Sequence, residues 1–354
     1  MKKFFRIILL IINLFAAAAL ILSTLAGSIE PSRCVAISIL SYAYVIFLLA
    51  NIAFIIIWLC LSRWEFLISV AAIVARLSFI PLFFQIGGNI EKTPGDDVLR
   101  IMTFNCHSFT GRDYDNPTSR DTNALSFLAL LNEEDPDVIC LQEFYSSRHV
   151  KLADSLANRG YQHHFSIHSN SIAQTILFSR YPITQGLTID KKSKFYADID
   201  MHGTPVRICG VHLDSYQLDS NDFESFENLS HAKTDSTTHR LLKKFTETTR
   251  CHEQEWKEEL LPLIQQTTTP FILTGDFNDT PASYIYQQAT TLLCDPYIEQ
   301  GRGFGTTYHG PYPAFRIDYI LHTPDIEALS YKRISTPISD HCPIVVDLRI
   351  PSNQ

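Results

Sequence analysis

The chain has 354 residues, a length that suits one large domain or two of ordinary size. Hydrophobic residues make up 46 % of it, but they dominate the stretch before about Gly88, and nearly all charged residues come later. The formal net charge of −8 argues against a wide basic face that tracks along nucleic acid, although a local basic groove is compatible with it. The composition therefore indicates a membrane segment joined to a charged, globular domain.

The apolar stretch divides into three blocks, residues 4–26, 34–61 and 66–86. Each reaches the roughly 20 residues that a helix needs to cross a bilayer. We therefore expect a multi-pass membrane protein that begins with a bundle of three transmembrane helices. Arg76 lies in the middle of the third block, where a charge costs about 2.5–3.5 kcal/mol. It should bond to polar groups of the second block, such as Asn51 or Tyr44, or contact a lipid headgroup or an anionic substrate. Pro81 should kink or end this helix.

The positive charges predict which way the membrane segment is oriented. Lys2, Lys3 and Arg6 favour a cytoplasmic N-terminus, and Arg63, in the connection between the second and third blocks, is consistent with that side. Three crossings then place the globular domain outside the cytoplasm, on the periplasmic or extracellular face. If the first block is instead a cleaved signal peptide, the two remaining spans give the same location.

Eight cysteines show no Cys-x-x-Cys pair and no His/Cys spacing of the zinc type, so we expect no structural zinc site. Several lie in apolar runs and are expected as small buried side chains, while the sequence leaves disulfides open.

Residues 89–97, with Pro94 and Gly95, are predicted to be a linker, and residues 98–354 to form the globular domain. Apolar and β-branched runs predict strands over residues 98–104, 137–141, 174–179, 194–200, 205–211, 271–274, 316–322 and 343–348. Helical spacing predicts helices over residues 122–132 and 240–263 and from Ala282 onward. We expect the many charges of the second of these helices to lie on a solvated face.

Polar side chains stand at or beside the ends of the predicted strands: Asn105, Glu143, His212, Asp276, Asn278, Asp318, Asp340 and His341. Each has an ordinary structural explanation when taken alone, but sheet edges can gather such side chains into one concave site. Carboxylates with a carboxamide are hard oxygen ligands that suit magnesium or manganese. Two histidines beside them can move protons or stabilise an anion, and the combination suits hydrolysis of a phosphoester. Asp276 and Asn278 would point the same way if the chain stays extended.

Six short motifs that contain these residues follow one another along the chain: Met102-Thr103-Phe104-Asn105, Leu141-Gln142-Glu143, Gly210-Val211-His212-Leu213, Gly275-Asp276-Phe277-Asn278, Arg316-Ile317-Asp318-Tyr319 and Ser339-Asp340-His341. In this order they resemble the endonuclease/exonuclease/phosphatase superfamily of metal-dependent phosphoesterases. The resemblance covers nearly the whole globular domain and does not extend to the apolar blocks. It implies an α/β fold, a four-layer α/β/β/α sandwich of two mixed β-sheets with the site at one rim.

The resemblance also implies roles for the site residues. Glu143 and Asp340 would hold Mg2+ (or Mn2+), with Asn105 assisting. Asp276 would position or deprotonate the attacking water, and Asn278 would hold a phosphate oxygen. His212 would stabilise charge on the phosphate, and Asp318 would orient His341. Whether Asp276 or His341 is the base stays open.

These features predict a membrane-anchored phosphoesterase that hydrolyses a phosphodiester or phosphomonoester by in-line attack of water. Position beside a lipid bilayer and the acidic balance slightly favour a lipid headgroup over nucleic acid or a small phosphate ester. One alternative is a nuclease outside the cytoplasm. Another is a non-catalytic membrane protein that binds a phosphorylated ligand, which would not need the full set of metal ligands and histidines. The sequence identifies no protein partner.

Overall fold

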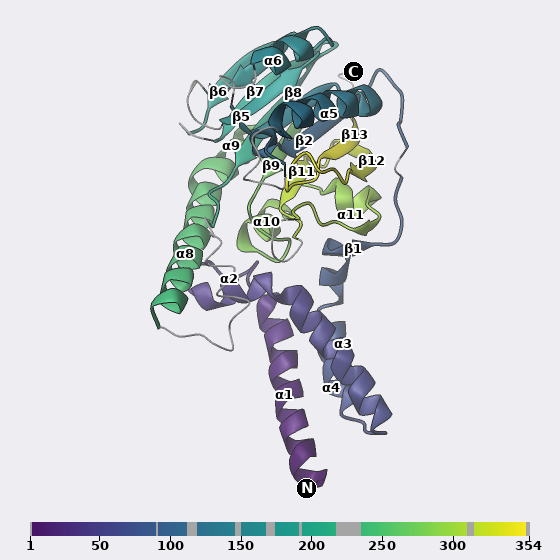
Figure 1. Ribbon diagram of the computed structural model, residues 1–354, viewed down its shortest axis with the longest axis vertical. Coiled ribbons are helices and arrows are strands. Elements are labelled where there is room, and N and C mark those ends of the chain that lie inside the picture. Colours follow the sequence, from purple (N-terminus) through teal and green to yellow (C-terminus); the bar gives the residue numbers. More distant parts are fainter. Residues whose placement is uncertain are drawn as a thin grey trace.

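The computed structural model describes residues 2–89, 91–111, 119–145, 150–167, 174–190, 193–216, 235–309 and 315–351. Two β-sheets with flanking helices form one end of the molecule, and a group of apolar helices projects from it (Figure 1). The N-terminus lies at the far tip of the first helix, away from the sheets (Figure 1).

In the described part of the chain, eleven strands form the two mixed sheets. The six-stranded sheet has the order β12 (Glu327–Arg333), β13 (Ile344–Arg349), β2 (Val98–Asn105), β3 (Val138–Phe144), β5 (Gln174–Ser179) and β4 (His163–Ser166). The five-stranded sheet has the order β11 (Asp318–His322), β9 (Phe271–Asp276), β8 (Thr204–His212), β7 (Phe195–Met201) and β6 (Ile183–Thr188). Among the strands that the structure describes in these sheets, only the neighbours β2 and β3, and β8 and β9, run parallel. The other pairs in the two sheets are antiparallel.

Apolar side chains between the sheets form the central core, because alternate strand residues of each sheet point inward. Ile101 and Cys140 of the first sheet belong to the same buried cluster as Ala197 and Ile208 of the second. Helices cover the outer faces: α5 (Ser119–Glu134) and α6 (Val150–Ala157) pack on the six-stranded sheet. The turn η4 (Glu255–Leu260), α9 (Leu261–Gln266) and α10 (Tyr284–Ala289) cover the other sheet. The fold is therefore the α/β sandwich of two mixed sheets that the sequence predicts.

The predicted helix over residues 240–263 differs in shape and in burial. It consists of α8 (Asp235–Gln254), the π-helical turn η4 and α9. The expectation of a solvated charged face is wrong for its middle, because His252, Glu253 and Glu255 are buried. Smaller elements complete the fold: η2 (His107–Phe109), α11 (Pro296–Gln300), and the paired strands β1 (Phe84–Gln85) and β10 (Gly303–Phe304).

The apolar blocks form shorter helices than the sequence predicts. The first is one helix, α1 (Lys2–Ser23), whose length and composition would let it cross a membrane, as those of a signal sequence would. The second divides into α2 (Val35–Tyr42) and α3 (Tyr44–Cys60), which meet at 66°. The third gives only α4 (Phe66–Ala75), about 15 Å long. The prediction of three spanning helices is therefore corrected to one, or two if α2 and α3 count as one bent span.

The third block ends early because its backbone changes from α-helix to the 3-10 helix η1 (Leu77–Leu82), which contains Pro81. Arg76 is therefore at the end of α4 and not in the middle of a span. Asn51, one of its expected partners, donates instead to the carbonyl oxygens of Ala16 and Phe47 at 3.0 and 2.9 Å. The Nε of Arg76 is buried without a hydrogen-bond partner in the described part of the chain.

Candidate active site

The polar residues that end the central strands meet at one rim of the sandwich. In the six-stranded sheet β2 ends at Asn105, opposite Gln142 of the parallel strand β3. In the other sheet the register pairs His212 with Asp276, and Asp276 with Asp318. Because parallel neighbours end at the same edge, side chains far apart in the sequence are brought together there.

Gly275 allows β8 and β9 to approach each other closely beneath this rim. It has a φ of +141°, and a Cβ atom at this position would lie 1.9 Å from the carbonyl oxygen of Val211. Any other residue would therefore push apart the two strands that carry His212 and Asp276.

Asn105 connects the two sheets through its side-chain amide. Its Nδ2 donates to Glu143 Oε1 at 3.1 Å and to Asp276 Oδ2 at 2.9 Å. His212 lies beside the same carboxylates, with Nε2 3.8 Å from Glu143 Oε1 and 3.7 Å from Asp276 Oδ2. Asn105 and Asp276 are both 1 % exposed, whereas the side chains of Glu143 and His212 are 29 % and 21 % exposed. One side of this group is therefore open to a ligand.

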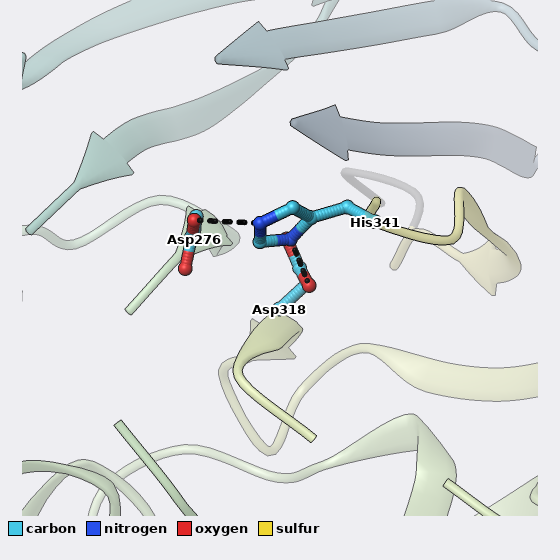
Figure 2. Close-up of side chains that lie close together, drawn as sticks. All are labelled: Asp276, Asp318 and His341. Carbon is cyan, nitrogen blue, oxygen red and sulfur yellow. Dashed lines mark hydrogen bonds and ion pairs between the residues drawn. The ribbon is translucent and has the colours of Figure 1, made fainter. Parts of the chain in front are cut away.

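His341 lies between two buried carboxylates (Figure 2). Its Nδ1 is 2.9 Å from Asp318 Oδ2, and its Nε2 is 3.8 Å from Asp276 Oδ2. Burial disfavours the charged imidazole, but Asp318 and Asp276 outweigh it and raise the pKa of His341 well above its ordinary value. Burial, with a contribution from Asp318, also raises the pKa of Asp276. The group can hold a proton and can exchange it with a neighbour.

Asn278 does not extend from the strand in the way that the two-residue spacing suggests. Its φ of 49° turns the chain, and its backbone N–H donates to Asp276 Oδ1 at 2.8 Å. Its side-chain Nδ2 donates to the carbonyl oxygen of Leu213 at 2.9 Å. The expectation that Asp276 and Asn278 point the same way along an extended chain is therefore wrong. The turn ties the end of β9 to the loop after β8.

Asp340 is joined to the same rim through Ser339. The hydroxyl of Ser339 is 2.9 Å from the carbonyl oxygen of Asn105 and 3.1 Å from Asp340 Oδ1. His107 Nδ1 is 3.6 Å from Asp340 Oδ1. Of the three predicted metal ligands, Asn105 and Glu143 are therefore in direct contact, and Asp340 is linked to Asn105 through Ser339.

The donor set fits a hard divalent cation. Glu143, Asp276 and Asp318 form no ion pair with a lysine or arginine in the described ranges, so histidines are their only charged protein partners there. Carboxylate and carboxamide oxygens prefer magnesium or manganese. Ligand-type atoms of Asp276, Asp318 and His341 also lie within 4.8 Å of one another, a set that differs from the predicted ligands. The predicted ligands Asn105, Glu143 and Asp340 offer oxygen donors alone, which a hard cation prefers to an imidazole nitrogen.

Several residues around the site were not singled out from the sequence. Asp279, the residue after Asn278, is 3 % exposed, and its Oδ2 lies 3.0 Å from His252 Nδ1. Tyr308 places its ring 5.0 Å from that of His341. Thr307 accepts from the backbone N–H of Asp318 at 3.1 Å. Asp279 directly follows the recognised motif that ends at Asn278, a position that could have drawn attention to it, whereas Thr307 and Tyr308 belong to no motif and leave no signal in local spacing.

Comparison with known proteins identifies the family. The profile of the endonuclease/exonuclease/phosphatase family matches residues 102–341, and that of a domain of unknown function (DUF8431) matches residues 3–83. A search of curated proteins found no match.

Similar solved structures include the endonuclease/exonuclease/phosphatase from Bacteroides vulgatus, with 20 % identity, a TM-score of 0.49, and coverage of 73 % of this chain and 100 % of that chain. The human Nocturnin catalytic domain with bound sulfate has 18 % identity, a TM-score of 0.49, and coverage of 72 % and 95 %. A humanized D. rerio TDP2 has 16 % identity, a TM-score of 0.49, and coverage of 71 % and 99 %. Because the first profile spans more than half of the sequence, this chain belongs to the endonuclease/exonuclease/phosphatase family, whose members are hydrolases that act on phosphoester bonds.

Proposed function

We propose that the protein is a membrane-anchored phosphoesterase that depends on a divalent metal ion and hydrolyses the phosphoester of a lipid headgroup. One packing contact carries the choice of substrate. Ala282, six residues after Asp276, is fully buried in a cluster with Leu20 of α1 and Tyr44 of α3. The loop that follows β9 therefore packs against the group of apolar helices. An enzyme anchored by these helices would hold its site beside the bilayer surface.

The apolar helices expose apolar side chains and bury polar ones, and this distribution supports anchoring by α1. Phe4, Phe5 and Phe15 of α1 are 65 %, 65 % and 72 % exposed. Inside the group, Asn13 is fully buried, donates to Ser69 Oγ at 2.6 Å and accepts from Trp58 Nε1 at 2.8 Å. Apolar residues outside and hydrogen-bonded polar residues inside suit a lipid environment. Because α1 supplies these contacts, we favour a retained anchor over a cleaved signal peptide.

The orientation follows from α1 alone. Lys2, Lys3 and Arg6 at its start favour the cytoplasmic side. The globular domain touches the opposite end of α1, where Gln288 donates to the carbonyl oxygen of Gly27 at 2.9 Å (Figure 1). If α1 crosses the membrane, the catalytic domain lies outside the cytoplasm.

We assign the chemistry to the side chains at the rim. Asp276 orients or deprotonates the water, which attacks phosphorus in line with the leaving oxygen. His341, held by Asp318, keeps a proton beside Asp276 and supplies or receives one during the reaction. His212 donates from its partly exposed ring to a phosphate oxygen, and Asn278 contacts another phosphate oxygen from the turn after β9.

Glu143 and Asp340, with Asn105 beside them, would hold the divalent ion. Bound there, Mg2+ or Mn2+ would neutralise charge on the phosphate and polarise the phosphorus centre. The family depends on divalent metal ions, and the oxygen-only donor set of this chain fits either of the two.

A substrate screen with the full chain tests the proposal. The purified protein in detergent micelles with Mg2+ would be offered phospholipid vesicles, single- and double-stranded DNA, and inositol phosphates. We expect release of the phospholipid headgroup, loss of activity on chelation, and no activity in a variant with Glu143→Ala and Asp276→Ala. Activity that survives chelation or survives the double substitution would contradict the metal-dependent site.

The other candidate functions are outcomes of the same screen. Faster turnover of DNA than of lipid, with a steep dependence on salt, would replace the lipid substrate by nucleic acid. Tight binding of a phosphorylated compound without product would show a binding protein and contradict hydrolysis. A reporter enzyme fused after residue 354, active only outside the cytoplasm, tests the orientation, and a silent reporter would contradict it.

A further inference from the structure

Helix α2 leaves the direction of α3 and packs against α8 of the catalytic domain (Figure 1). Its last residue, Tyr42, contacts Asp279 in the loop that follows β9. The Tyr42 hydroxyl donates to Asp279 Oδ1 and contacts the hydroxyl of Tyr216. The Tyr42 ring is fixed edge-on against Tyr216, Phe245 and Phe315, with centroid distances of 5.3, 5.6 and 6.0 Å. The aromatic packing fixes the ring, so the hydroxyl has a defined position on Asp279.

Asp279 belongs to the loop after β9 and is linked through His252 to the loop after β8. It lies three residues after Asp276 and accepts from the backbone N–H of Thr280 at 3.0 Å. Its Oδ2 is 3.0 Å from His252 Nδ1, and His252 Nε2 is 2.8 Å from the carbonyl oxygen of Asp214. Asp214 follows His212 by two residues. A chain of hydrogen bonds therefore runs from α2 through Asp279 and His252 to the loops of both catalytic strands.

Asp279 is buried, and a buried carboxylate needs donors to fix its position. It receives one donor from its own loop, one from His252 and one from Tyr42. Only Tyr42 comes from the segment that leads out of the apolar helices. Removing this donor would loosen the turn that holds Asp276 and Asn278 while leaving their own atoms unchanged.

We propose that Tyr42 is a positioning residue for catalysis: through Asp279 it sets the geometry of the catalytic turn, so that full activity requires the docked helix α2. This inference rests on the proposed phosphoesterase function. Tyr42 does not act on the reacting atoms. A displacement of about 1 Å at a catalytic group can reduce the rate about a hundredfold, so a single hydrogen bond at this place can be visible in kcat.

The same two parts of the chain also touch at contacts that do not reach the catalytic turn. The hydroxyl of Ser32 donates to Glu253 Oε1 at 2.9 Å, and Lys257 Nζ lies 2.7 Å from Glu30 Oε1. These contacts keep α2 close to α8 when the Tyr42 hydroxyl is removed. Ser32→Ala is therefore a matched control, because it weakens docking without touching Asp279.

The experiment uses the full chain in detergent with Mg2+ and a small soluble substrate, bis-(p-nitrophenyl) phosphate. The variants are Tyr42→Phe, Asp279→Ala, the two combined, and Ser32→Ala. We expect Tyr42→Phe to lower kcat about ten- to a hundredfold with KM unchanged. The combined variant should be no slower than Asp279→Ala alone, because both changes break one connection. Ser32→Ala should keep the wild-type kcat.

Each other outcome overturns the proposal. A wild-type kcat in Tyr42→Phe would show that α2 does not position the site. Additive losses in the combined variant would show that Tyr42 does not act through Asp279. An equal loss in Ser32→Ala would show that docking alone matters and that the hydroxyl has no special role. A wild-type chain without turnover on any phosphoester would instead reject the proposed function, and this inference with it.

Discussion

Asp276→Asn is expected to remove activity while leaving the fold intact. In the wild type Asp276 Oδ1 accepts from the N–H of Asn278 and Oδ2 accepts from Asn105 Nδ2, at 2.8 and 2.9 Å. An asparagine at this position has one acceptor oxygen and one donor nitrogen. It can keep only one of the two bonds, and its NH2 group then faces another donor. The lost bond costs about 1–3 kcal/mol of unfolding free energy.

A second effect opposes this loss. Burial raises the pKa of Asp276, so the folded state holds its charged form at a cost at any pH above the unfolded pKa of about 4. Asparagine is neutral and removes that cost. We therefore expect the unfolding free energy in EDTA to fall by no more than about 1–3 kcal/mol. The rate should fall about 10²- to 10⁴-fold, because the amide cannot accept a proton from water.

The assay measures kcat on a soluble phosphodiester with saturating Mg2+, and unfolding by heat or denaturant in EDTA. Asp347→Asn is the control, since Asp347 is also fully buried but pairs with Arg100, away from the rim. That variant should lose stability and keep its kcat per folded molecule. A kcat within tenfold of wild type in Asp276→Asn, or an equal loss in Asp347→Asn, would refute the role of Asp276.

Three further predictions follow from single features. Gly275→Ala should prevent folding or destabilise the chain severely, because the new Cβ would lie 1.9 Å from the carbonyl oxygen of Val211. Gly203 has a φ of +91°, and a Cβ added there would meet no atom within 4 Å, so Gly203→Ala should cost only about 1–3 kcal/mol of unfolding free energy. Soluble yield and unfolding curves compare the two, and equal losses would contradict the strand-contact argument. Glu143→Gln should raise the Mg2+ concentration for half-maximal activity at least tenfold, whereas the partly exposed Glu299→Gln should not; an unchanged Mg2+ titration would exclude Glu143 as a ligand. Burial opposes the charge on His252, but Asp279 outweighs this effect and raises the pKa of His252. The charged histidine therefore stabilises the fold below about pH 6.5, and this stabilisation is lost as the pH rises through the pKa of His252 in the folded state. The stability difference between wild type and His252→Gln should therefore be larger at pH 6 than at pH 9, and a difference that grows with pH would contradict the assignment.

The interior strands and the buried edge strand β11 could be predicted from the sequence, and the partly exposed edge strands could not. Central strands such as β9 and β13 are buried along nearly their whole length and appear as continuous apolar runs. The strands β4, β6 and β12 lie at sheet edges, with partly exposed and polar residues, and give no such run. The sequence pattern therefore identifies the core of the sandwich and misses those borders where the strand is partly exposed.

The gathering of these polar residues at one rim could be predicted because each stands at or beside the end of a recognisable strand. What could not be predicted is how they are held. Tyr42 and Asp279 are 237 residues apart, and His252 belongs to a helix whose charges suggested a solvated face. The turn at Asn278 depends on its positive φ, which an Asp-x-Asn spacing does not reveal.

The apolar segment shows the limit of length and composition. Residues 34–61 are predominantly apolar, and nothing at Ala43 predicts a break, since neither glycine nor proline is present there. The bend occurs where α2 packs on α8 and Tyr42 reaches Asp279, both contacts with a distant part of the chain. Tertiary packing, and not local sequence, decides how this block divides.

The most direct test of a single cation site at the rim is anomalous diffraction from crystals of the full chain grown with Mn2+. We predict one strong peak in contact with the carboxylate of Glu143 and beside Asn105 and Asp340. A peak held by Asp276, Asp318 and His341, or an ion that binds away from Glu143, would contradict the account.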